Sequence, residues 1–257
     1  MNAKALDIAL RFTKDNNVKI NSAHAIVRSY LTNRDNCAAD YLCSESVKKR
    51  NEAEYLVNDS LEFCAENNIP FLVLHLGQLE SDEIIFAEKK VLESKHIAPL
   101  GLMKLRERYG KEHVYRLVET INHWAEIYPN TKIAIENRNR ISQVPMLNEL
   151  QFILQHTKSS HVGHWHDMAH ARAFERLTGI KRSLWWSKIG ARVWGNHVQD
   201  SKFDYSEHLP LSFGDDQIDK NSLGKTQFWV LEVSSEHPES KLKKSISILN
   251  DMRYSLC

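Results

Sequence analysis

The sequence predicts an α/β fold, a (β/α)8 barrel of the TIM type that lacks its first two strands, and three observations support this prediction. Short apolar runs alternate along the chain with amphipathic segments long enough for helices, an order that builds a parallel sheet. The runs are almost continuously apolar, as in 71–77 (FLVLHLG), which is typical of strands covered on both faces. Each run also ends in a side chain able to bind a metal. Strand ends converge on one point more readily in a closed ring of strands than in an open sheet.

The expected elements follow one another in regular alternation. A helical pattern opens the chain, over 3–17, and the first strand pattern follows it. The six expected strands are, in order, VKINSAH (18–24), FLVLHLG (71–77), KIAIEN (132–137), VGHWHD (162–167), VWGNHVQ (193–199) and QFWVLEV (227–233). Amphipathic periodicity predicts the helices between and after them over 51–67, 111–128, 144–156, 169–178 and 241–252. No Pro-rich, Gly-rich or Ser-rich linker divides the pattern, so we expect one barrel domain over residues 1–257.

Six strands leave an eight-stranded ring two strands short. The residues after Glu232 hold only one helical pattern, so the missing strands are expected at the N-terminus, where the chain opens directly on a helix. Such a chain would be a barrel truncated at its N-terminus, with its first and last strands as open edges. Because unpaired edges favour association, we expect a homodimer or poor solubility.

Composition and charge argue against several classes of protein. The 34 basic and 33 acidic residues give a formal charge of +1, so the field that draws many proteins to nucleic acid is absent, although a local basic groove remains possible. Neither GxGxxG nor GxxxxGK[ST] occurs, which leaves a nucleotide site without support. The longest apolar stretch is far shorter than a spanning helix, so no membrane role is expected. The four cysteines show no CxxC spacing and no signal sequence opens the chain, so we expect reduced thiols in a cytoplasmic protein.

Four strand ends carry side chains that predict a metal site. Glu136, Asp167, His197 and Glu232 each close a different expected strand. A buried carboxylate is costly unless it is paired or bound to a metal, and solvent-exposed strand ends would not explain four such positions together. Three carboxylates and one imidazole suit a divalent ion, Zn²⁺ or Mn²⁺ before Mg²⁺ or Fe²⁺.

Further histidines lie at or near the same strand ends. His24 and His75 close two other strands, His170 follows the fourth strand, and His208 lies in a later loop. Gly77 allows close backbone approach beside His75. For each of the four histidines, a structural or surface role stays open beside the binding of a metal or a substrate.

Other polar residues near these motifs have simpler explanations. Arg138 and Arg140 directly after Glu136 could meet a phosphate, although a solvated loop is the commoner explanation. Alternation along one strand cannot place every histidine of HVGHWHD on the side of Asp167, so those three are interpreted as structural. The remaining histidines fall in helical or loop patterns and are expected to play no part in the site: His96, His113, His123, His156 and His237.

Five short motifs occur in a characteristic order. They are IAIEN with Glu136, HDMAHA with Asp167 and His170, NHVQDSK with His197 and Asp200, the stretch from His208 to Gly214 followed by Ile218 and Asp219, and VLEV with Glu232. In order and spacing they resemble the xylose-isomerase-like barrel superfamily. That group holds sugar and sugar-phosphate isomerases and epimerases together with endonuclease-IV-type apurinic endonucleases. The likeness runs from about His24 to the C-terminus.

The resemblance implies a divalent metal and roles for several residues. The implied metal ligands are Glu136, Asp167, His197 and Glu232, with His24 and His75 as additional ligands in the multi-metal branch. Glu136 and Glu232 would also move protons in the epimerase branch. His170 would bind a substrate oxygen, and Lys202 and His208 would make further contacts with the substrate.

Three hypotheses for function follow. The first is an isomerase or epimerase that acts on a small sugar or sugar phosphate by proton transfer through an enediolate. The second is an endonuclease-IV-like phosphodiester hydrolase with several zinc ions, which would also use His170 and His208. Against it, Ser206 stands where those enzymes supply an aspartate, HLGQL lacks their further histidine, and the near-neutral charge does not favour DNA. The third is a degenerate barrel that binds a ligand or partner without catalysis.

Overall fold

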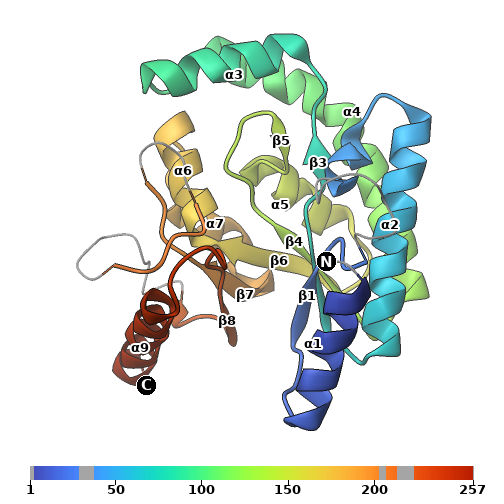
Figure 1. Cartoon of the computed structure of the whole chain (residues 1–257). Coiled ribbons are helices and arrows are strands. Elements are labelled where there is room, and N and C mark those ends of the chain that lie inside the picture. The colour runs from blue at the N-terminus through green and yellow to red at the C-terminus, as the bar shows by residue number, and fades with distance from the viewer. Residues whose placement is uncertain (1–2, 29–37, 203–206, 213–222, 257) are drawn as a thin grey trace.

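The computed structural model describes residues 3–28, 38–202, 207–212 and 223–256, and six parallel strands form its main sheet (Figure 1). The strands are β1 (Ser22–His24), β2 (Phe71–Leu74), β4 (Lys132–Glu136), β6 (Val162–Asp167), β7 (Val193–Val198) and β8 (Phe228–Leu231). They lie side by side in this order, and every neighbouring pair is parallel. In the described part of the chain, β1 and β8 are the edges of this sheet. The prediction of a parallel sheet with strands in chain order is therefore confirmed.

The sheet is curled rather than flat. The ring centroids of Phe71 on β2 and Phe228 on β8 lie 5.2 Å apart, although three strands separate β2 from β8 in the sheet. Neighbouring strands lie about 4.8 Å apart, so a flat sheet would hold β2 and β8 about 19 Å apart. The six strands therefore form a partial TIM barrel, as predicted. A cavity of about 500 Å³, lined by residues of β1 and β8, lies between the two edges.

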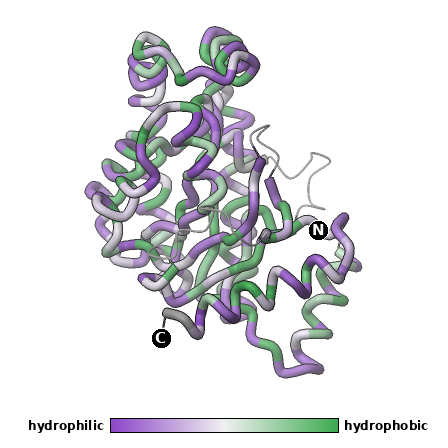
Figure 2. The backbone as a smooth tube through the Cα atoms, turned by 90° about the vertical axis from the view of Figure 1, so that its left-hand side faces the viewer, coloured by the Kyte–Doolittle hydropathy of each residue, from purple (hydrophilic) through white to green (hydrophobic). Residues whose placement is uncertain are grey.

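Helices surround the sheet, and several of them pack directly on its strands (Figure 1). They are α1 (Ala3–Asp15), α2 (Val47–Glu66), α3 (Asp82–Ser94), α4 (Leu100–Ile127), α5 (Leu147–His156), α6 (Met168–Thr178), α7 (Ser183–Ile189) and α9 (Glu239–Leu256). Strand residues alternate between the two faces, and the outward members, such as Leu72, Leu74 and Ile133, join the main core beneath the helices. Figure 2 shows hydrophobic segments of the chain in the middle of the molecule. None of the helices in the described ranges has both the length and the apolar character needed to cross a bilayer.

A smaller aromatic core fills the inside of the partial barrel. Phe71 packs on Trp165 and Trp194, with ring centroids 5.9 and 5.6 Å away. Two glycines make room for the indoles. A Cβ added at Gly195 would lie 2.4 Å from the Trp165 ring, and one added at Gly163 would lie 2.6 Å from the Trp194 ring. The two tryptophans therefore lie in slots that only glycine leaves open on the neighbouring strands.

The structure also contains elements that the sequence patterns do not predict. The strands β3 (Gly77–Gln78) and β5 (Gln143–Val144) form a separate antiparallel pair. A strand of two residues is too short to show an alternating pattern in the sequence. Helix α7 has seven residues, too few for a clear amphipathic repeat, and α3 is likewise absent from the predicted set. The first expected strand, 18–24, is reduced to Ser22–His24. Two short 3₁₀ helices, η2 (Ala38–Cys43) and η3 (Gly190–Arg192), complete the elements of the described ranges.

Candidate metal centre

The strand ends bring four predicted ligands to one place. Glu136 is the last residue of β4, Asp167 the last of β6, His197 the penultimate residue of β7, and Glu232 follows β8 directly. One ligand atom from each lies within 4.8 Å of those of the other three. Parallel strands end at the same edge of a sheet, and curling of the sheet turns that edge into a ring. The convergence is thus a direct result of the topology.

His197 lies at the centre of this group. Its Nδ1 atom is 3.0 Å from Glu136 Oε1, 3.1 Å from Glu232 Oε2 and 3.9 Å from Asp167 Oδ2. Glu136, Asp167 and His197 are buried, and Glu232 is half-buried. Gln199 donates from Nε2 to Asp167 Oδ2 at 2.6 Å and to Glu232 Oε2 at 3.1 Å, which orients both carboxylates. Three carboxylates around one imidazole leave excess negative charge, and a divalent cation would compensate it.

A clamp between neighbouring strands holds Asp167 in position. Asn137 donates from Nδ2 to the Asp167 carbonyl oxygen at 2.9 Å and accepts from the Asp167 amide at 2.8 Å. Asp167 also caps helix α6, where its Oδ1 accepts from the His170 amide at 2.6 Å. One carboxylate oxygen thus stabilises a helix N-terminus, and the other remains among the proposed ligands.

The charges of the group shift its pKa values in opposite directions. Burial opposes protonation of His197, but Glu136 and Glu232 outweigh it and raise the pKa of His197 to about 9. Burial alone would raise the pKa of Glu136, whereas His197, His170 and His24 together lower that pKa well below its usual range. For Glu232, burial is the larger effect and raises the pKa, although His197 opposes it. The two glutamates therefore differ in proton affinity.

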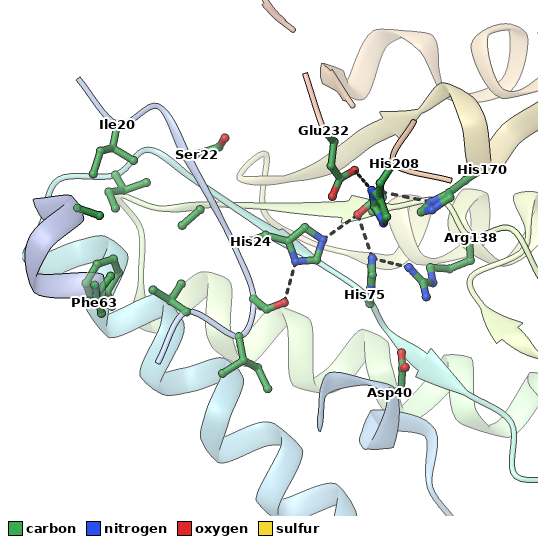
Figure 3. A pocket seen from close by; sticks show the side chains of 18 of the residues that line it. Ile20, Ser22, His24, Asp40, Phe63, His75, Arg138, His170, His208 and Glu232 are labelled. Carbon is green, nitrogen blue, oxygen red and sulfur yellow. Dashed lines mark hydrogen bonds and ion pairs between the residues drawn. The ribbon is translucent and has the colours of Figure 1, made fainter. Parts of the chain in front are cut away.

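A second group shares Glu136 with the first. His24 Nε2 and His75 Nε2 lie 2.9 and 3.0 Å from Glu136 Oε2, and Figure 3 shows both rings directed to the same point. His24 Nδ1 lies 2.7 Å from the carbonyl oxygen of Ala25, which can only accept, so Nδ1 carries the proton. With Nδ1 bound to the backbone, Nε2 is the His24 nitrogen that faces Glu136 and could bind a metal. A backbone hydrogen bond at Nδ1 is typical of metal-binding histidines.

A carboxylate that the sequence did not single out lies beside His170. Glu207 Oε2 is 2.9 Å from His170 Nε2, and Asn139 donates to the same oxygen at 2.8 Å. His170 Nδ1 lies 2.9 Å from the carbonyl oxygen of Asn137. Although burial lowers the pKa of His170, the carboxylates of Asp167, Glu136 and Glu207 raise it well above its usual value. His170 is therefore protonated at both nitrogens in this arrangement.

The remaining predicted contacts differ in their placement. His208 is half-exposed and lies in the left-handed region at φ 59°, with Nδ1 4.0 Å from Glu232 Oε2. The side chain of Lys202 is exposed and is not among the residues that line the cavity around the metal groups. Residues Ser206, Gly214, Ile218 and Asp219 lie outside the described ranges.

Both metal groups open into one cavity of about 620 Å³. Its polar wall consists of His24, Asp40, His75, Glu136, Arg138, His170, Glu207, His208 and Glu232. Its other end is apolar and is formed by α1, β1 and the residues that follow β1. The cavity can therefore hold a small polar molecule against the proposed metal ligands.

Two histidines interpreted as structural face away from this cavity. His164 Nδ1 donates to the carbonyl oxygen of Ile135 at 2.8 Å, and His164 Nε2 lies 3.2 Å from His166 Nδ1. Both rings pack against Trp185, at centroid distances of 5.6 and 6.3 Å. Burial lowers the pKa of His164 to about 4, so the ring is neutral. These contacts fit a structural role.

Comparisons with known proteins give matches in structure but not in sequence. No model of a protein family matches the chain, and no curated protein matches its sequence. A D-tagatose 3-epimerase-like protein is 19% identical, with a TM-score of 0.61 over 99% of this chain and 84% of its own. The protein IOLI, with a bound zinc atom, is 14% identical, with a TM-score of 0.58 over 100% of this chain and 93% of its own.

A third similar solved structure is described as a xylose isomerase-like TIM barrel. A xylose isomerase-like TIM barrel protein from Mycobacterium smegmatis, in complex with magnesium, is 13% identical, with a TM-score of 0.56 over 100% of this chain and 80% of its own. At such identities the likeness shows the fold and not the activity. The chain therefore has the fold of the xylose isomerase-like TIM barrel proteins.

Proposed function

We propose that this protein is a metal-dependent isomerase or epimerase that acts on a small sugar or sugar phosphate. The observation that carries the proposal is the convergence of Glu136, Asp167, His197 and Glu232 within 4.8 Å, with Glu136 and Glu232 on the wall of a cavity large enough for a sugar. The donor set suits a divalent ion, with Zn²⁺ or Mn²⁺ before Mg²⁺. Solved structures of the same fold that are described as epimerase-like support the proposal.

The chemistry divides between the bound ion and the side chains. A divalent metal, when bound by these four residues, supplies a positive charge that makes a C–H next to a sugar carbonyl more acidic. Glu232 has a pKa raised by burial and accepts that proton, which leaves an enediolate. Glu136, the second of the two glutamates, relays a solvent proton back to the enediolate carbon. His170 and His208 line the same cavity and contact the substrate oxygens.

Elemental analysis and isotope exchange test this proposal. We expect the purified protein to hold a divalent metal and to incorporate solvent deuterium into a ketose at the carbon next to its carbonyl. Glu232→Gln should abolish the exchange and Glu136→Gln should lose the metal. Equal metal content in the wild type and both variants would overturn the proposed site, and metal-loaded protein that exchanges no C–H of any ketose would overturn the activity.

The second metal group favours a second candidate function, a multi-zinc phosphodiester hydrolase. His24 and His75 meet one carboxylate oxygen of Glu136 and His197 meets the other, so this carboxylate could take part in two metal sites. Paired ions of this kind clamp the attacking and leaving oxygens in phosphodiester hydrolysis. Glu207 also provides a carboxylate beside His170, one residue after Ser206.

Metal stoichiometry and DNA binding separate the two candidates. The hydrolase requires at least two equivalents of zinc, together with binding to abasic duplex DNA that weakens steeply as salt rises. One equivalent of metal and no salt-dependent DNA binding would leave the isomerase as the only candidate of the two.

A further inference from the structure

An arginine lies among the carboxylates of the cavity. Arg138 follows Glu136 by two residues, in the loop after β4, and its side chain lines the cavity beside His75 (Figure 3). The guanidinium Nη1 atom lies 2.5 Å from His75 Nε2. The Nε atom is inaccessible to solvent and has no hydrogen-bond partner among the described residues. Arg138 thus contributes a charge and an unused donor to the site.

The carboxylates near Arg138 are bound to other groups. Glu207 accepts from His170 and Asn139, at 2.9 and 2.8 Å. Glu136 is contacted by four imidazoles, at 2.9 to 3.3 Å: those of His24, His75, His170 and His197. The charge of Arg138 acts on Glu207 without a direct ion pair among the described residues. A half-buried guanidinium with no carboxylate in direct contact is unusual, because the charge is costly to desolvate.

The single contact of Arg138 is incompatible with a metal at the second group. His75 Nε2 has one lone pair, which can accept from Arg138 or bind a metal but cannot do both. A metal at His75 therefore releases Nη1, and the guanidinium then offers Nη1 and Nε without protein acceptors. Ions at both metal groups would also balance the charge of the surrounding carboxylates, so Arg138 would then leave the loaded cavity with a local excess of positive charge.

We propose that Arg138 binds the phosphoryl group of the substrate and makes the site select sugar phosphates over free sugars. This inference rests on the proposed function and narrows its substrate class. A planar guanidinium binds two phosphoryl oxygens at once, whereas the hydroxyl groups of a free sugar offer no matching charge. A dianionic substrate also restores the charge balance of the metal-loaded cavity.

The test measures binding rather than turnover. Isothermal titration calorimetry on the metal-loaded protein uses fructose, fructose 6-phosphate and inorganic phosphate as probes. We expect the wild type to bind the phosphorylated sugar more tightly than fructose. Arg138→Gln should reduce that preference roughly 10- to 100-fold, the range expected when a charge-assisted hydrogen bond is lost. Arg138→Lys should lose part of this preference, since a lysine ammonium keeps the charge but cannot donate two parallel hydrogen bonds to one phosphoryl group.

Arg140→Gln is the matched control, because Arg140 lies in the same loop but does not line the cavity. It should retain the preference. No binding of inorganic phosphate by the wild type, an unchanged preference in Arg138→Gln, or an equal loss in Arg140→Gln would each overturn the inference. Failure of the proposed function is a separate result, namely no deuterium exchange into either sugar while the preference for phosphate persists.

Discussion

His24 Nε2 lies 2.9 Å from Glu136 Oε2, while His24 Nδ1 is bound to the carbonyl oxygen of Ala25 at 2.7 Å. One ring thus connects the backbone after β1 to the carboxylate that closes β4, two strands away in the sheet. Because Glu136 faces His24 and His75 with one oxygen and His197 with the other, it is the residue common to both candidate metal groups.

We predict that Glu136→Gln lowers the metal content of the protein more than His24→Gln does. Glu136 belongs to both groups, whereas His24 belongs to only one, so the first group stays intact in His24→Gln. Elemental analysis after removal of free metal measures the difference. His96→Gln, a change at an exposed position outside the cavity, should leave the content unchanged. If His24→Gln lost as much metal as Glu136→Gln, the division into two groups would be wrong.

We predict that the stability of the chelator-treated protein falls as the pH is lowered from 7 toward 4. Burial lowers the pKa of His164 to about 4, whereas the unfolded chain takes up this proton near pH 6.5. At His164 the unfolded state therefore binds more protons than the folded state throughout this window, and the stability lost through this group reaches about 3 kcal/mol below it. His170 and His197, whose pKa values are raised, act in the opposite direction only near pH 7. Urea unfolding at several pH values measures the slope.

His164→Asn provides the control for this pH dependence. An asparagine amide can replace the Nδ1–H donor to the Ile135 carbonyl, and it does not titrate. The variant should have a shallower slope between pH 4 and 7. An unchanged slope would show that other groups account for the acid sensitivity.

We predict that Gly195→Ala destabilises the fold by about 1–3 kcal/mol, the usual cost of overpacking a core. The added Cβ would lie 2.4 Å from the Trp165 ring, which is fully buried and has no room to move. Gly101→Ala is the control, since a Cβ there meets nothing within 4 Å and the position is helical. Urea unfolding should show a loss only for Gly195→Ala, and equal stability of both variants would contradict the packing of the aromatic core.

We predict that the purified protein associates through the open edges of its sheet. Strands β1 and β8 each have one neighbour in the described part of the chain, and unpaired strand edges favour pairing with another chain. Light scattering coupled to size-exclusion chromatography should show a dimer or larger species at micromolar concentration. A monomer that stays soluble over that range would contradict this prediction.

The parts of the site that strands position were predictable from the sequence, and the parts that loops position were not. Glu136, Asp167 and His197 close strands whose apolar pattern is clear, and parallel pairing then brings those ends together without further information. Glu207 lies in a loop where no period relates it to a neighbour. Ser206, where the endonuclease-type enzymes supply an aspartate, counted against the hydrolase, yet the adjacent residue Glu207 places a carboxylate beside His170.

The contact between Arg138 and His75 illustrates the same limit. Sequence proximity to Glu136 placed Arg138 near the site, but a solvated loop was the commoner explanation for such an arginine. Its burial depends on how the loop after β4 meets the end of β2, and a single sequence does not encode that geometry in any local pattern.

Strands β6 and β7 each carry one tryptophan and one glycine, and the tryptophan of each strand packs over the glycine of the other. This pairing determines the width of the interior of the partial barrel. A ring of eight strands is wider and is ordinarily filled by layers of branched aliphatic side chains. Here the large Trp165 and Trp194 span a narrower enclosure, each lying over a glycine of the neighbouring strand. Enlarging the ring to eight strands by protein engineering would therefore require a redesigned interior, with smaller residues replacing the indoles and side chains restored at Gly163 and Gly195.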